Sequence, residues 1–155
     1  MIGCHFYFAF KFNFIRLDIA SFIYIMNNRW LMASSHTSLF SAIYCIHHGI
    51  RWHWIYPLGV YINSINYWRY PVRGMRRNVD MAFGCSGLAV SLIYSYWNVA
   101  DLWAYYWLTF LACFMYPISC WLHAHNYFML STIAHMMIHL FGNAGKIVLY
   151  NQIKT

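Results

Sequence analysis

Five long apolar runs, separated by short polar segments, follow one another in the sequence after residue 28. In chain order they cover Leu31 to His48, Trp52 to Trp68, Val79 to Trp97, Leu102 to Leu122, and Asn126 to Phe141, with an extension to Tyr150 as an alternative. The runs are too continuous for alternating barrel strands, and irregular backbone exposed to lipid would leave amide groups without hydrogen bonds. The pattern therefore predicts an all-α fold, a polytopic transmembrane helical bundle of about five spans. The first two runs are short or polar, so we expect them to be tilted, interfacial or sheltered by the other helices.

The first 28 residues follow a different pattern, because Lys11, Arg16 and Asp18 interrupt a run in which phenylalanines alternate with other residues. We expect this segment to be a helix along the membrane interface, with its cations at the lipid headgroups. A sixth span is the alternative. The rest of the chain, residues 29–155, has no internal repeat, low-complexity tract or linker, so we expect a single transmembrane bundle there.

Composition supports an integral membrane protein. Of the 155 residues, 62% are apolar, 22% are aromatic and only 8% are charged, and one small soluble core could not bury that much apolar surface. The net charge of +7 would suggest nucleic-acid binding in a soluble chain. Here the cations are few and lie at the ends of apolar runs, so we expect membrane lipids as partners and no nucleic acid.

The cations also indicate how the chain is oriented. Four of them crowd one short loop, namely Arg69, Arg73, Arg76 and Arg77. Because short loops rich in arginine stay on the cytoplasmic side, we expect the Arg69–Arg77 loop there, in contact with anionic headgroups.

Two histidines in the last run are the strongest indication of chemistry. His135 and His139 lie one helical turn apart, inside a stretch from Leu102 to Gly145 that has no charged side chain. Two imidazoles at this spacing share one face of a helix about 6 Å apart, where both can reach one zinc ion. Polar groups at membrane depth usually have a function.

Topology predicts which other polar residues lie near this pair. The arginine loop joins the second and third runs, and the loop before the last run is two crossings away, so both loops share one side of the membrane. Ser64 lies near the end of the second run, Asp80 opens the third, and His123 and His125 precede the last. We therefore expect Ser64, Asp80 and the histidines to meet.

Three short motifs follow one another along the chain: Ser64-Ile65-Asn66-Tyr67-Trp68, then Arg76-Arg77-Asn78-Val79-Asp80, then His135-Met136-Met137-Ile138-His139. Their order resembles the CREST superfamily of membrane hydrolases, which includes alkaline ceramidases, progestin and adipoQ receptors, and lipid-remodelling factors of the Per1 type. The family signature is Ser-x-x-x-His, then Asp, then His-x-x-x-His. The resemblance covers about Val60 to Phe141.

This resemblance implies zinc-dependent hydrolysis of lipid amide or ester bonds. In the family three histidines hold the zinc ion, so His135 and His139 would be two metal ligands here. Asp80 and Ser64 would be the catalytic residues beside the metal-bound water. Asp80 would position or deprotonate that water, and Ser64 would donate a hydrogen bond to the developing oxyanion.

The chain departs from the family in two respects. The third histidine position is Trp68, whose indole donates a hydrogen bond but cannot bind a metal. We expect His125 to be the third zinc ligand if zinc is bound, with His123, His36 and Asp80 as alternatives. The family usually has seven spans, and this chain has about five.

Simpler interpretations compete with the enzymatic one. His135 and His139 can be core histidines bonded to neighbouring groups, and Asp80 can pair with Arg76 or Arg77 near a helix N-terminus. The chain would then be a non-catalytic membrane subunit or structural bundle that packs on membrane-protein partners.

A third alternative is a haem-binding bundle, in which His36 and one histidine of the last run would ligate the iron. We expect His47, His48 and His53, which flank a loop with Arg51, to be hydrated interface residues.

Overall fold

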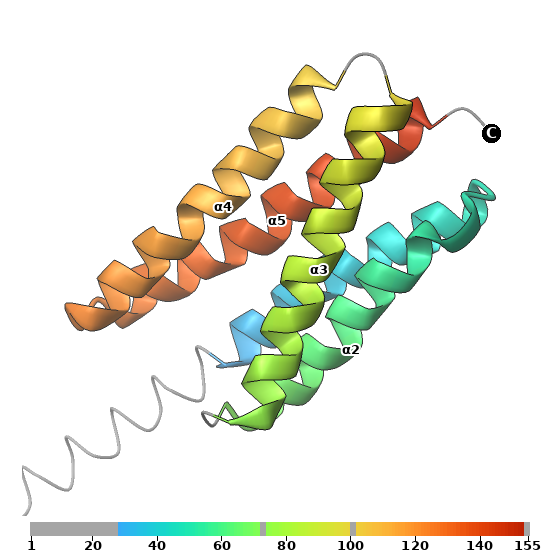
Figure 1. Ribbon diagram of the computed structural model, residues 1–155. Helices are drawn as coiled ribbons and strands as arrows, with labels where there is room; N and C mark the ends of the chain where they lie inside the picture. Colours follow the sequence, from blue (N-terminus) through green and yellow to red (C-terminus); the bar gives the residue numbers. More distant parts are fainter. Residues whose placement is uncertain (1–27, 72–73, 100–101, 154–155) are drawn as a thin grey trace, which may run out of the picture.

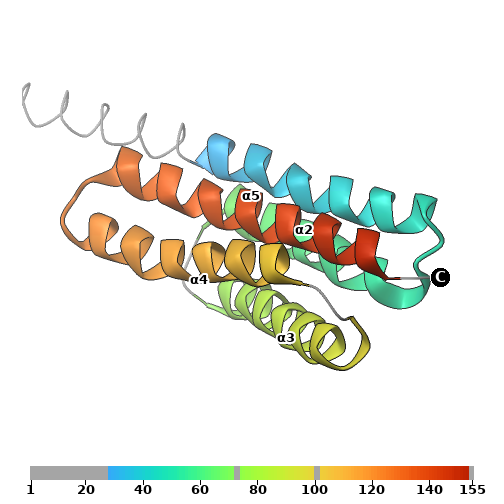
Figure 2. The same ribbon diagram turned by 90° about the horizontal axis from the view of Figure 1, so that it is seen from above.

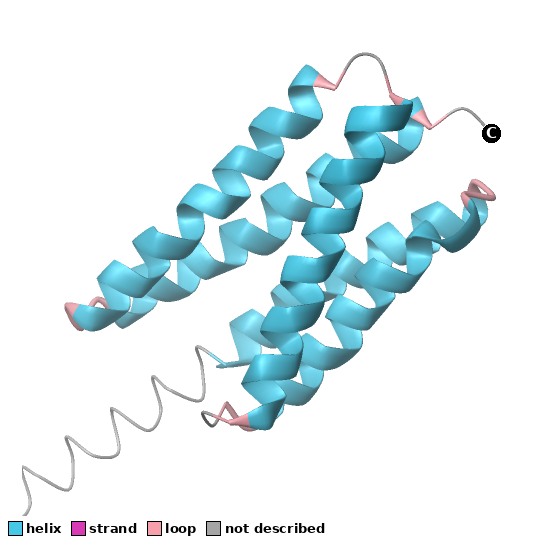
Figure 3. Ribbon diagram, in the orientation of Figure 1, coloured by secondary structure: helices cyan, strands magenta, loops and turns pink. Residues whose placement is uncertain are grey.

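The structure, a computed structural model, describes residues 28–71, 74–99 and 102–153, which form helices joined by short turns and contain no strand (Figure 3). A helix of residues 28–47 comes first. It is followed by the short 3-10 helix η1 (Arg51–Trp54), then α2 (Ile55–Arg69), α3 (Met75–Asn98), α4 (Trp103–Ala124) and α5 (Phe128–Gln152). The predicted all-helical fold is confirmed. The interfacial helix expected over residues 1–28 lies outside the described residues, apart from residue 28.

The helices form two hairpins, with α5 in the middle of the bundle. In Figures 1 and 2, α4 and α5 run side by side, α2 pairs with α3, and the helix of residues 28–47 lies beside α5. Among α2, α3, α4 and α5, close backbone packing occurs within the α4–α5 and α2–α3 hairpins. Asn143 of α5 bonds to Ser38, so α5 has α4 on one side and the helix of residues 28–47 on another.

Small residues hold α4 and α5 together. A Cβ atom at Gly145 would lie 3.4 Å from the Leu108 Cβ, so the helices touch closely there. Ser119 and Ser131 bond reciprocally, since the Ser119 Oγ donates to the Ser131 carbonyl at 3.0 Å and the Ser131 Oγ donates to the Ser119 carbonyl at 2.9 Å. Close approach at glycine and hydroxyl hydrogen bonds between helices are typical of packing in membranes.

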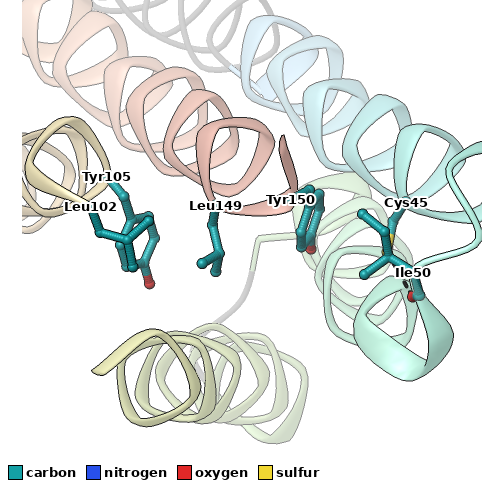
Figure 4. Close-up of a cluster of buried hydrophobic side chains, with 6 residues drawn as sticks. All are labelled: Cys45, Ile50, Leu102, Tyr105, Leu149 and Tyr150. Atoms are coloured by element: carbon teal, nitrogen blue, oxygen red, sulfur yellow. Dashed lines mark hydrogen bonds between the residues drawn. The ribbon is translucent and has the colours of Figure 1, made fainter. Parts of the chain in front are cut away.

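Polar side chains fill the interior, and apolar side chains cover the outside. Fully buried positions include Ser35, Ser41, Ser64 and Ser95, whereas large apolar residues such as Phe40, Ile93 and Trp97 are exposed. A soluble bundle would show the opposite distribution. A compact apolar cluster lies at one end of the bundle and consists of Cys45, Ile50, Leu102, Tyr105, Leu149 and Tyr150 (Figure 4).

Within the part of the chain that the structure describes, two helices, α3 and α4, are long and apolar enough to cross a membrane, by length and composition. Trp97 is the last residue but one of α3 and Trp103 is the first residue of α4, and their side chains are 75% and 70% exposed. Exposed tryptophans at helix ends are typical of the aromatic belt at a membrane interface. These helices favour association with a membrane. The total of about five spans stays a prediction.

The contact between α2 and α3 predicts that two glycines of α3 differ in how well they tolerate a larger side chain. A Cβ at Gly87 would lie 3.3 Å from the Tyr56 side chain, whereas a Cβ at Gly84 would meet nothing within 4 Å. We expect Gly87→Leu to lower the free energy of unfolding by about 1–3 kcal/mol because it overpacks this contact. The matched variant Gly84→Leu should change it by less than about 0.5 kcal/mol. Unfolding of the purified protein in mixed detergent measures both, and equal losses would contradict the packing described.

Candidate functional site

Two sets of contacting side chains come from three helices, Ser64 with Asp80 and Trp68 with His135 and His139, and we call them together the polar cluster. Ser64 and Trp68 come from α2, Asp80 from α3, and His135 and His139 from α5. In α2, Ser64 and Trp68 are four residues apart, so they share one face of that helix. His135 and His139 share a face of α5 for the same reason. The cluster thus contains the residues of all three family-like motifs.

A hydrogen bond between Ser64 and Asp80 connects α2 to α3. The Ser64 Oγ donates to the Asp80 Oδ1 at 2.6 Å, and the Ser64 side chain is only 1% exposed. This length is typical of a hydroxyl that donates to an ionised carboxylate. The two residues flank the arginine loop in the sequence, and the helical hairpin brings them back together. The structure thus gives Asp80 a hydroxyl partner.

Trp68 packs directly against the histidine pair. The Trp68 and His135 ring centroids are 5.2 Å apart and the rings are nearly perpendicular, at 78°. The His135 and His139 centroids are 5.5 Å apart. The Trp68 Nε1 and the His139 Nε2 are both buried without a hydrogen-bond partner. The residue at the third motif position therefore contacts His135, and it does so with an indole.

Asn143 holds the histidine helix in place, although the sequence analysis did not single it out. Its Nδ2 donates to the His139 carbonyl at 2.7 Å and to the Ser38 Oγ at 3.0 Å, and its side chain is 6% exposed. This amide connects α5 to the helix of residues 28–47. Its position four residues after His139, on the same helical face, was the signal that could have identified it.

The other histidines considered as ligands lie elsewhere. His125 is exposed at the end of α4, where its Nδ1 is 2.8 Å from the Trp121 carbonyl oxygen and its ring packs on the Trp121 indole. His123 packs on Phe128, and His36 packs on Tyr61. Within the described residues, no three His, Cys, Asp or Glu side chains come together as a metal site requires. His125 is thus not grouped with His135 and His139.

His53 differs from the hydrated residue that the sequence suggested. It is only 7% exposed, and its ring stacks on Trp52 with centroids 4.2 Å apart and meets Tyr94 at 4.4 Å. By contrast, His47 and His48 are exposed, as expected.

The donor set of the polar cluster does not fit a family-type zinc ion. Catalytic zinc usually has three protein ligands and a water, and the cluster offers two imidazoles with an indole in the third position. An indole has no lone pair for a metal. Two imidazoles alone would bind divalent metals weakly and with little selectivity.

Comparisons of the chain with family models, with curated proteins and with solved structures found no match.

The Ser64–Asp80 hydrogen bond predicts energetic coupling between α2 and α3. In a double-mutant cycle with Ser64→Ala and Asp80→Ala, we expect the sum of the two single losses in the free energy of unfolding to exceed the loss in the double variant by about 1 kcal/mol or more. The reason is that either truncation leaves the remaining partner unpaired. Unfolding in mixed detergent measures the cycle, with Ser86→Ala as control because the Ser86 hydroxyl bonds within its own helix, to Phe83. Fully additive losses would show that the bond contributes nothing.

Proposed function

We propose that this chain is a multi-pass membrane protein of CREST-like arrangement in which Trp68 has replaced a metal ligand, and that it acts as a non-catalytic membrane component. The contact between the Trp68 indole and His135 is the observation that carries the proposal. The supporting features are the Ser64–Asp80 bond and the polar interior, which match a helical bundle built for a membrane.

The position of Trp68 supports both the resemblance and the loss of metal chemistry. In the family-like alignment, residue 68 should face the histidine pair, and its ring does so with a centroid distance of 5.2 Å to His135. A large indole on that side takes up the space where a third imidazole would approach. The contact between Trp68 and His135 thus supports the family-like arrangement of the helices and argues against a zinc ion bound at this site.

The remaining polar groups do not form a metal-free hydrolase. A serine nucleophile needs a base that accepts its proton and a third group that orients the base. Here the Ser64 hydroxyl donates directly to Asp80, and the described contacts include no hydrogen bond from Ser64 to His135 or His139. We therefore assign the Ser64–Asp80 pair to joining the helices.

The outer surface suits a component of a membrane assembly. Residues 81–86 of α3 are exposed, although Phe83 also packs against Gly59 of α2, so the outer side of this segment lies against lipid or against another membrane protein. We propose five crossings, with the Arg69–Arg77 loop at the cytoplasmic side. Membrane lipids and membrane-protein partners are the expected binding partners.

Metal content tests this function directly. We expect detergent-purified wild-type protein, freed of any affinity tag, to contain no stoichiometric zinc. Trp68→His should gain about one zinc per chain, because a third imidazole then completes the ligand set. That zinc should disappear in Trp68→His/His135→Ala.

Trp97→His is the matched control, because Trp97 is exposed and lies on another helix. It should not gain zinc. One zinc per wild-type chain, lost in His135→Ala/His139→Ala, would overturn the proposal. Failure of Trp68→His to bind zinc while it remains folded would show that residue 68 does not stand at a ligand position.

A further inference from the structure

A buried histidine at the other end of the bundle connects the two hairpins. His53 belongs to η1, and its ring centroid lies 4.4 Å from that of Tyr94 in α3 and 6.2 Å from that of Tyr150 in α5. The Tyr150 hydroxyl donates to the His53 carbonyl at 3.3 Å. Trp52 stacks on the same imidazole at 4.2 Å. One residue of a short helix thus contacts both hairpins through aromatic rings.

The His53 imidazole has no polar partner. The residue is 7% exposed, and both ring nitrogens are buried without a hydrogen bond to the described part of the chain. A neutral imidazole carries one N–H donor, whereas an imidazolium carries two and a positive charge. A buried charge without a partner costs far more than one unpaired neutral group. The packed arrangement therefore accommodates the neutral ring and opposes its protonation.

The titratable groups packed around this end of the bundle do not offset a positive charge. They are the phenols of Tyr94 and Tyr150 and the thiol of Cys45, which are ordinarily neutral at pH 7. The elements that contact His53 also carry two cationic residues, Arg51 in η1 and Lys146 one turn before Tyr150. None of these groups supplies a negative charge near neutral pH.

The one side-chain carboxylate among the described residues lies near the opposite end of α3. There Asp80 accepts the hydrogen bond from Ser64. Tyr94 is further along the same helix, about 20 Å away at the helical rise. Asp101 lies outside the described residues. The described structure therefore gives a protonated His53 no counter-ion.

Movement of η1 would expose a cysteine. Cys45 is fully buried, and its Sγ donates to the Ile50 carbonyl oxygen at 3.2 Å. Ile50 directly precedes η1, and Figure 4 shows Cys45, Ile50 and Tyr150 in one cluster. The backbone of η1 packs closely on α2, its continuation, so side chains hold it against α3 and α5. The accessibility of Cys45 thus reports whether η1 is in place.

We propose that the contacts of His53 form an acid-sensitive closure of this end of the bundle. The neutral ring keeps η1 against Tyr94 and Tyr150. Protonation favours an open form in which η1 leaves both tyrosines and water bonds to the two N–H groups. An imidazole in water binds a proton near about pH 6.5. Because the closed form excludes the proton, the ratio of open to closed protein rises about tenfold between about pH 7.5 and 5.5.

The closure lies on the opposite side of the bundle from the arginine loop. In chain order η1 precedes α2, whereas the Arg69–Arg77 loop follows it. With that loop at the cytoplasmic side, as proposed above, η1 is at the non-cytoplasmic side, and acidification there would open the bundle. The closure does not depend on metal binding at the polar cluster.

Thiol labelling of the full-length protein in a neutral detergent tests this closure. With Cys4, Cys85 and Cys120 replaced by serine, buried Cys45 reports on η1, and exposed Cys113 corrects for the reactivity of the reagent at each pH. Brief pulses of N-ethylmaleimide are quantified by mass spectrometry after proteolysis. We expect the labelling ratio of Cys45 to Cys113 to rise about tenfold from about pH 7.5 to 5.5. His53→Phe keeps an aromatic ring but binds no proton, so its ratio should stay constant.

His48→Phe is the matched control, because His48 is an exposed histidine at the same end of the bundle. It should keep the tenfold rise, and so should Asp101→Asn, because the closure uses no carboxylate. Where the phenylalanine variant fails to fold, His53→Gln supplies the same comparison. A constant ratio in the parent protein would overturn the proposal. So would an equal rise in a folded His53 variant, or loss of the rise in His48→Phe.

Discussion

The polar face of α5 is the constraint on which the rest of the bundle depends. Inside a membrane, polar side chains find their partners within the protein, and α5 finds one on each neighbouring element. Its contacts, in chain order, join Ser131 to Ser119 of α4, His135 to Trp68 of α2, Asn143 to Ser38 of the helix of residues 28–47, and Tyr150 to the His53 carbonyl of η1. Because these contacts come from one helix face, the position of α5 determines which groups meet in the interior.

Two regions with different chemistry follow from this arrangement. At the level of His135 and His139, the Trp68 indole packs against His135, and the Asp80 carboxyl group accepts a hydrogen bond from Ser64. Further along the same face, the Asn143 amide nitrogen donates to the His139 carbonyl and to Ser38, while its Oδ1 is buried without a hydrogen-bond partner. The first region combines aromatic rings with a carboxyl group, and the second is a network of neutral polar groups.

The helical fold and the meeting of Ser64 with Asp80 could be predicted from the sequence, because continuous apolar runs indicate helices and a short loop returns the chain to the same end. The position of His125 could not be predicted. It directly follows the last residue of α4, where its Nδ1 lies 2.8 Å from the Trp121 carbonyl oxygen. Sequence spacing does not reveal that contact. Likewise, the sequence does not reveal that the His53 ring stacks on Trp52 and is buried. Asn143 was missed because it lies beyond Phe141, in a stretch that the apolar pattern gave only as an alternative extension to Tyr150, whereas α5 continues to Gln152.

The most direct measurement of the central claim is a crosslinking experiment between residues 68 and 135. With the native cysteines replaced by serine, Trp68→Cys/His135→Cys should react with a short bifunctional thiol reagent to give an intramolecular crosslink, detected by mass spectrometry after proteolysis. The pair Trp68→Cys/His125→Cys is the comparison, because His125 lies exposed at the end of α4. We expect efficient crosslinking of residue 68 with residue 135 and little with residue 125. The reverse result would contradict the placement of the indole beside the histidine pair.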